Sequence, residues 1–183
     1  MSIRTIGVAI GLPEPYAGEL EKWRDDLGDP LARAIPAHIT LVPPTEVAAA
    51  DIASLEAHLR AVGERQWPFE IQLRGTGSFR PVSPVVFVSL AVGISGCERL
   101  EQAVRTGPLD RPRRFNYHPH VTVAHDVPGA VLDRAFAELA DYQAAFDVTH
   151  FGLFEQGGDG VWRTEYEFPL VGAAQPVVRG SES

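Results

Sequence analysis

The sequence has one cysteine, no long apolar run and no surplus of basic residues, and each shortage excludes a class of protein. Cys97 alone cannot form an intrachain disulfide, and it offers no cysteine-based metal site. No stretch approaches the roughly 20 apolar residues that a membrane-spanning helix needs. A formal net charge of −8 argues against a broad basic face that grips long nucleic acids. A small anionic substrate or the end of an RNA remains compatible with this charge.

The rest of the composition is that of a globular protein. Hydrophobic residues make up 45% and charged residues 22% of the 183 residues, which suffices for one domain with its own core. We expect this domain over residues 1–172 and a flexible tail over 173–183. The N-terminus lacks a signal-peptide pattern, and the lone cysteine fits a reducing compartment, so we expect a cytoplasmic protein. We also expect the protein to be a monomer.

The chain repeats the order strand, helix, strand, helix, strand. Val8 precedes His38 by 30 residues, and Val88 precedes His120 by 32. A capping box at Ser95 predicts the start of one helix. The first repeat, about 1–80, is predicted to hold elements at 5–10, 13–28, 37–42, 48–62 and 69–79. The second, about 84–170, is predicted to hold elements at 85–90, 95–105, around 120–122, from 128 and at 146–154, with a glycine turn at 157–160 and a returning strand at 161–168.

Each repeat carries one His-x-Thr tripeptide on its middle strand. Successive side chains of a strand point to opposite faces, so His38 and Thr40 share one face, as do His120 and Thr122. The aliphatic residues between them point to the other face, which would be buried. If a pseudo-twofold axis relates the repeats, the two pairs confront each other across a cleft.

Two imidazoles and two hydroxyls in one cleft suit phosphodiester hydrolysis. A neutral imidazole can take a proton from the attacking oxygen, and a charged one can give a proton to the leaving oxygen. Histidine supplies both forms near neutral pH. Threonine hydroxyls can donate to the non-bridging phosphate oxygens. The scheme requires no metal or other cofactor.

The hexapeptides 37–42 and 119–124 resemble the paired motifs of the 2H phosphoesterase superfamily, in its bacterial 2′-5′ RNA ligase-like, or RNA 2′,3′-cyclic phosphodiesterase, branch. The resemblance extends to about residue 170. It implies a bilobal α+β fold, with two antiparallel sheets flanking a central cleft and helices outside. It also implies opening of 2′,3′-cyclic phosphates to 2′-phosphates, and in some members 2′-5′ joining of RNA ends.

The resemblance assigns roles to four residues. His120 would be the general base and His38 the general acid, while Thr40 and Thr122 would hold the phosphate. RNA ends or small cyclic nucleotides would be the substrates. Two alternatives stay open: a 2H phosphoesterase for another small cyclic phosphate, such as one derived from ADP-ribose, and a non-catalytic module that binds RNA or nucleotides.

Two further clusters contain residue types that bind ligands. His118, His120 and His125 lie close in sequence, but a regular strand would turn His125 to the opposite face, and no carboxylate or cysteine completes a zinc site. The loop at 107–114 contains Arg111, Arg113 and Arg114, with Phe115 and Tyr117 just beyond. These side chains could bind a phosphate tail and stack on a base, or the loop could be a solvated charged turn.

Overall fold

The structure, a computed structural model, describes residues 2–174, so the predicted tail lies almost entirely outside the described part. Within it, the protein has an α+β fold, as predicted. The strands are β1 Ile3–Gly11, β2 His38–Ala48, β3 Phe69–Ser78, β4 Val85–Val92, β5 His120–His125, β6 Gln143–Val148, β7 His150–Gln156 and β8 Trp162–Pro169. The helices are α1 Tyr16–Asp26, α2 Ile52–Arg65, α3 Ile94–Val104 and α4 Gly129–Glu138, with short 3-10 turns at Ala49–Asp51 and Gly107–Leu109.

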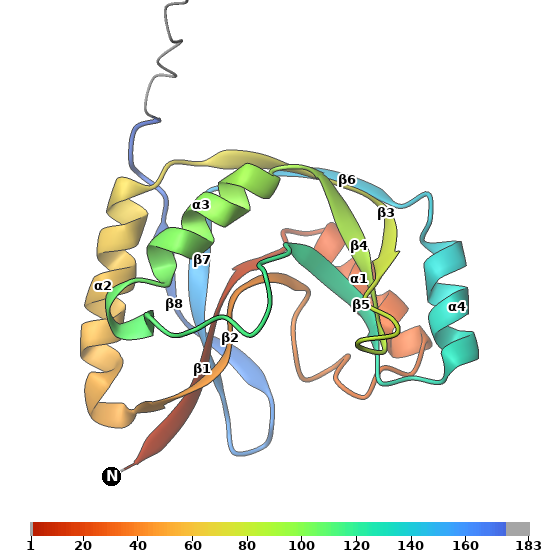
Figure 1. Cartoon of the computed structure of the whole chain (residues 1–183), viewed down its shortest axis with the longest axis horizontal. Helices are drawn as coiled ribbons and strands as arrows, with labels where there is room; N and C mark the ends of the chain where they lie inside the picture. The colour runs from red at the N-terminus through yellow and green to blue at the C-terminus, as the bar shows by residue number, and fades with distance from the viewer. Residues whose placement is uncertain (1, 175–183) are drawn as a thin grey trace, which may run out of the picture.

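The strands form a curled antiparallel sheet with the order β6-β3-β4-β5-β2-β1-β7-β8 (Figure 1). The family resemblance implied two sheets, and two four-stranded halves are present, but β2 and β5 join them into one sheet. The only residue pair in that junction is Ile39 with Val121. Because the join is so short, the two halves diverge on either side of it, and the two His-x-Thr strands lie at the centre of the sheet.

The two repeats exchange strands. β3, from the first repeat, pairs with β4, whereas β7, from the second repeat, pairs with β1. The tripeptides 69–71 and 146–148, which resemble each other in sequence, are cross-strand partners in β3 and β6. Each half of the sheet therefore contains strands from both repeats, and neither repeat builds a half alone.

The helices cover the sheet on the side away from the half-buried His and Thr side chains. α1 and α4 pack against β5, while α2 packs against β7 and β8, and α3 against β2 (Figure 1). The face of α2 that meets the sheet carries Leu55, Leu59 and Val62, all with 1% exposure or less. Ile39 and Val121 are fully buried in the same core, as the alternation of the strands predicted.

Three predicted element boundaries were wrong. Ser95 does not cap α3, which begins after Gly93 in a left-handed conformation (φ 99°); a side chain at Gly93 would meet the carbonyl oxygen of Glu70 at 2.6 Å. The strand predicted at 146–154 is two strands, β6 and β7, interrupted at Thr149. β2 continues past Pro43 and Pro44 to Ala48 because its later residues pair with the start of β1.

Candidate active site

The β2–β5 junction brings the four predicted site residues together. Ile39 pairs with Val121 in antiparallel register, so one residue further in each direction His38 lies opposite Thr122, and Thr40 lies opposite His120. All four side chains are half-buried, while Ile39 and Val121 are buried on the opposite face. Directly opposite residues have Cβ atoms about 5 Å apart. The two histidines therefore occupy diagonal corners of a small square.

A cavity of about 240 Å³ opens over this square. His38, His120 and Thr122 line it together, and we call it the central cavity. Thr40 lies at its margin and lines the two neighbouring cavities, one next to His38 and one next to His120. The two imidazoles thus line the same open cavity, which is large enough for a phosphate group.

The two histidine rings are held by the same contact. The Nδ1 atom of His38 lies 2.7 Å from the carbonyl oxygen of Pro36, and Nδ1 of His120 lies 2.7 Å from the carbonyl oxygen of His118. A carbonyl oxygen only accepts hydrogen bonds, so each Nδ1 carries the proton. In the neutral ring Nε2 is then a free base, and in the charged ring Nε2–H is an acid. Each imidazole is oriented for proton transfer through Nε2.

The pKa values of both imidazoles are lowered. Burial lowers the pKa of His120 to about 4, and the neighbouring His118 and His38 add to the effect. Burial also lowers the pKa of His38, with a further contribution from the positive charge of Arg24. Both rings are therefore neutral at pH 7 in the empty site. A phosphate anion between them would favour the charged form of its neighbour.

A β-bulge adds a third imidazole to the central cavity. Between β4 and β5, Phe87 pairs with Thr122 but Val86 pairs with Ala124, so Val123 is an extra residue. Val123 and Ala124 are both buried, and the alternation of the strand is reversed beyond them. His125 therefore lines the same cavity as His120. The prediction that His125 points to the opposite face was wrong because it assumed a regular strand.

Besides the orientation of His125, the sequence reasoning missed Arg24, whose guanidinium group is buried. Arg24, on α1, is 3% exposed and lines the central cavity. Its Nε donates to the carboxylate of Asp29 at 3.1 Å, and a terminal nitrogen donates to the carbonyl oxygen of Ile35 at 3.1 Å. An arginine between Leu20 and Leu27 on the apolar stripe of the helix was the available signal. Its fixed positive charge favours an anion in the cavity.

Comparison with known proteins identifies the family. The family model of the 2′-5′ RNA ligase superfamily matches residues 12–160. The chain belongs to this superfamily of 2H phosphoesterases. A Geobacillus kaustophilus protein that carries the name of a phosphoesterase is 30% identical over 145 residues, covering 78% of this chain and 83% of that protein. A Bacillus licheniformis protein with the same kind of name is 30% identical over 149 residues, covering 79% and 86%.

Solved structures share the fold. The crystal structure of E. coli LigT with phosphate has a TM-score of 0.66 at 23% identity, covering 93% of this chain and 99% of that one. LigT in its apo form has a TM-score of 0.68 at 21% identity, covering 92% and 98%. The bilobal 2H phosphoesterase fold that the paired motifs predicted is therefore confirmed.

In this 2H phosphoesterase, aromatic rings surround His120. The Phe79 ring meets the His120 ring edge to face, with centroids 4.8 Å apart, and Phe87 lies 5.2 Å away on the same side. These apolar rings account for part of the desolvation that lowers the pKa of His120. No such aromatic pair is found for His38 among residues 2–174. The two halves of the site are therefore alike in backbone and different in surroundings.

The side chains of the arginine-rich loop fall into two groups, those that anchor the loop and those that are exposed. Arg113 donates from two nitrogens to the buried carboxylate of Glu101, at 2.9 and 2.6 Å, and so anchors the loop. Tyr117 donates to the carbonyl oxygen of Thr40 at 3.0 Å, which ties the loop to β2 and leaves its ring half-buried. Arg114 and Phe115 are exposed and make no such hydrogen bond, with the guanidinium 5.3 Å from the ring centre. They border a cavity shared with Thr40 and His120.

The described residues 2–174 contain no cluster of three or more His, Cys, Asp or Glu side chains arranged to hold a metal ion. No helix in that range is long and apolar enough to cross a membrane. Cys97 is buried, and burial raises the pKa of its thiol to about 12. This cysteine is a core residue rather than a nucleophile.

Proposed function

We propose that the protein opens 2′,3′-cyclic phosphates to 2′-phosphates, at RNA ends or on nucleotides, without a metal. The observation that carries the proposal is the pair of imidazoles at diagonal corners of one cavity, each with its Nδ1 held by the backbone and its Nε2 available. Superfamily membership and the similarity to phosphoesterases support the reaction class. LigT structures with phosphate, 3′-AMP, ATP and NADP+ support a small nucleotide as ligand.

In the proposed mechanism, His120 Nε2 removes a proton from water as the water oxygen attacks phosphorus. The bond from phosphorus to the 3′ oxygen breaks, and His38 Nε2–H gives its proton to that oxygen. The products are a 2′-phosphomonoester and a free 3′ hydroxyl. Thr122 and Thr40 donate to non-bridging oxygens, and the Arg24 charge offsets the phosphate charge. The same ring opening, with an RNA 5′ hydroxyl attacking phosphorus in place of water, gives a 2′-5′ phosphodiester and a free 3′ hydroxyl, which is 2′-5′ joining.

The proposal extends to the compartment, the oligomeric state and the size of the substrate. We place the enzyme in the cytoplasm as a monomer that acts on RNA ends or small cyclic nucleotides. A buried, unpaired Cys97 supports a reducing compartment. The net charge of −8 supports short substrates held by local positive groups, such as Arg24, over long nucleic acids.

The test is hydrolysis of 2′,3′-cyclic AMP in EDTA, followed by ³¹P NMR to locate the product phosphate. We expect adenosine 2′-phosphate as the product. His38→Ala and His120→Ala should each lower kcat by about 10²- to 10⁴-fold, the usual contribution of a general acid or base. His150→Ala is the matched control, because His150 is exposed and does not line the central cavity.

Three results would count against the proposal. Activity that survives both substitutions would remove the histidines from the mechanism, and activity that disappears with the chelator would require a metal. Affinity for the nucleotide without turnover would favour the binding-module alternative. A cyclic phosphate derived from ADP-ribose belongs in the same substrate panel, since preferential turnover of it would favour that alternative substrate.

A further inference from the structure

The buried guanidinium of Arg24 has one nitrogen without a protein partner. A guanidinium group carries N–H donors on three nitrogens. Nε of Arg24 donates to Asp29, and Nη1 donates to the carbonyl oxygen of Ile35. Within residues 2–174, Nη2 makes no hydrogen bond, and no fully buried side-chain nitrogen or oxygen lacks a partner. Nη2 is therefore accessible, and it opens onto the central cavity, which the side chain lines.

Asp29 fixes the guanidinium in place. Its carboxylate is fully buried and accepts a second hydrogen bond, at 2.8 Å, from the backbone N–H of Leu31. The backbone N–H of Asp29 donates to the carbonyl oxygen of Arg24 at 3.0 Å, so main chain and side chain both join the two residues. Asp29 does not line the central cavity. A ligand in the cavity therefore meets the donor side of this ion pair, already oriented before the ligand binds.

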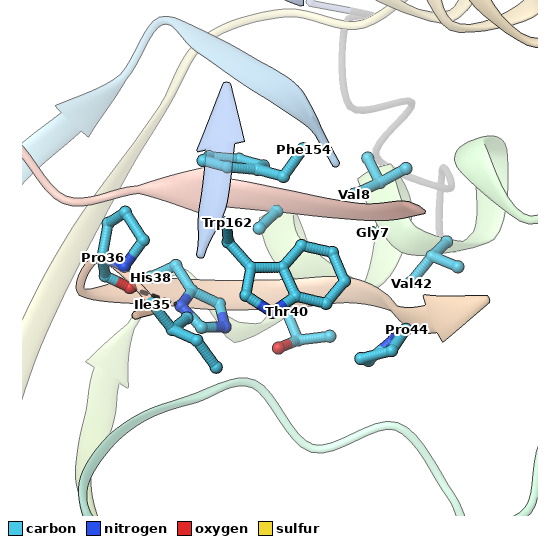
Figure 2. Close-up of a pocket in the computed structure, with 11 residues that line it drawn as sticks. Gly7, Val8, Ile35, Pro36, His38, Thr40, Val42, Pro44, Phe154 and Trp162 are labelled. Carbon is cyan, nitrogen blue, oxygen red and sulfur yellow. Dashed lines mark hydrogen bonds between the residues drawn. The ribbon is translucent and has the colours of Figure 1, made fainter. Parts of the chain in front are cut away.

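Arg24 is also tied to the loop that orients His38. Nη1 donates to the Ile35 carbonyl, and the next residue, Pro36, provides the carbonyl oxygen that holds Nδ1 of His38. Figure 2 shows Ile35, Pro36 and His38 together at one end of a neighbouring pocket. The guanidinium is near enough to the ring for its charge to lower the pKa of His38. An anion held beside His38 in the central cavity therefore lies near Arg24 as well.

The lining of the central cavity leaves this positive charge without a competing anion. No Asp or Glu is among the described residues that line it. Burial lowers the pKa values of His38 and His120, so neither ring adds a charge to the empty site at pH 7. The guanidinium of Arg24 stays charged throughout the working range of pH. The strength with which the cavity binds an anion therefore rises with the charge of that anion.

The substrate and the product of the proposed reaction differ in charge. A 2′,3′-cyclic phosphate is a diester with one negative charge. The 2′-phosphate product is a monoester whose second pKa is about 6, so at pH 8 it carries close to two negative charges. Hydrogen bonds from a charged donor are stronger when the acceptor carries more charge. A fixed guanidinium in the cavity therefore favours the product over the substrate.

We propose that Nη2 of Arg24 donates directly to a phosphate oxygen in the central cavity, and that this contact makes the protein bind its 2′-phosphate product more tightly than its cyclic substrate. The proposal rests on the cyclic phosphodiesterase function above and adds regulation by the product. A 2′-phosphomonoester that accumulates occupies the cavity and slows turnover. Asp29 is a positioning residue here, because it holds the guanidinium without touching the ligand.

Calorimetry at pH 8 in EDTA tests the contact without turnover. The two ligands are 3′-deoxyadenosine 2′-phosphate and its methyl ester, which carry two and one negative charges and cannot cyclise. We expect the wild type to bind the monoester about tenfold or more tightly than the methyl ester. Arg24→Lys keeps a charge beside Asp29 but has a single nitrogen, so it should weaken monoester binding by about 10- to 100-fold and methyl ester binding much less.

Two further variants separate the contact from effects on the fold. Arg24→Met combined with Asp29→Asn removes both charges of the buried pair together and should show the same selective loss. Arg33→Lys is the matched control, because Arg33 is an exposed arginine that pairs with Asp25 and does not line the central cavity. It should change neither affinity.

Inhibition kinetics test the regulation. Adenosine 2′-phosphate should compete with 2′,3′-cyclic AMP, with an inhibition constant below KM in the wild type and a tenfold higher ratio of the two constants in Arg24→Lys. Equal wild-type affinities for the two analogues, or an equal loss of both in Arg24→Lys, would overturn the proposal, since a structural role weakens both alike. An inhibition constant above KM would also overturn it. Absence of hydrolysis would instead overturn the proposed function, while calorimetry would still decide the Arg24 contact.

Discussion

At the scale of single residues, the candidate site holds two imidazoles with nearly identical backbone settings, to which we assign opposite proton-transfer roles. Each ring uses Nδ1 for a carbonyl two residues earlier, and each has its pKa lowered by burial. The residue types were readable from the sequence, because His-x-Thr occurs twice at matching places. The pKa directions were not, because they depend on Phe79, Phe87 and Arg24, which come from other elements.

The lowered pKa of His120 makes stability depend on pH. Its pKa is about 4 in the folded protein and about 6.5 when unperturbed, so the unfolded chain binds this proton first as the pH falls. The contribution to stability is complete above pH 6.5 and is lost as the pH falls towards 4. We expect His120→Asn to flatten the decline of the unfolding free energy across that window, measured by urea denaturation.

The control is His150→Asn, which alters an exposed histidine outside the cavity. It should keep the wild-type slope. A His120→Asn protein whose stability falls as steeply as that of the wild type between pH 6.5 and 4 would show that the ring is solvated in the folded state.

At the scale of elements, a bulge decides which side chains line the central cavity. β2 and β5 share the burial order half-buried, buried, half-buried, buried, buried across their first five residues, so each departs from alternation at the same place. The residue that follows is Pro43 in β2 and His125 in β5. A sequence cannot show the extra residue, because Val123 and Ala124 suit a buried strand in either register. His125 is therefore one of the side chains that make the near-symmetric site unequal.

We expect His125 to bind the substrate phosphate from its place in the central cavity. His125→Leu should raise KM for 2′,3′-cyclic AMP by about 10- to 100-fold with a smaller change in kcat, as loss of a hydrogen bond to a charged group predicts. His150→Leu should leave both constants unchanged. An unchanged KM in His125→Leu would show that the bulge presents the ring to solvent instead of to substrate.

At the scale of the whole molecule, one short junction between β2 and β5 brings the two His-x-Thr motifs together. The order of the elements could be predicted from the sequence, because periodicity is a local property. The duplication and the roles of the four motif residues stay predictions, drawn from motif spacing. The sequence could not predict that β3 and β7 exchange halves, since strand pairing depends on contacts between distant segments. It also missed Arg24, which reaches the central cavity from α1. The two motifs lie on adjacent strands of one sheet because β2 pairs with β5.

The central claim is that one neutral and one charged imidazole act on the same phosphorus. It is tested most directly by the pH dependence of kcat/KM for 2′,3′-cyclic AMP in EDTA, with the residual activities of His38→Ala and His120→Ala measured alongside. We predict a bell-shaped profile for the wild type, with its optimum below pH 6.5 because both pKa values are lowered in the free enzyme. His120→Ala should lose the acidic limb, and His38→Ala the alkaline limb. A wild-type profile that is flat from pH 4 to 8, or variants that both keep the full bell, would contradict the account.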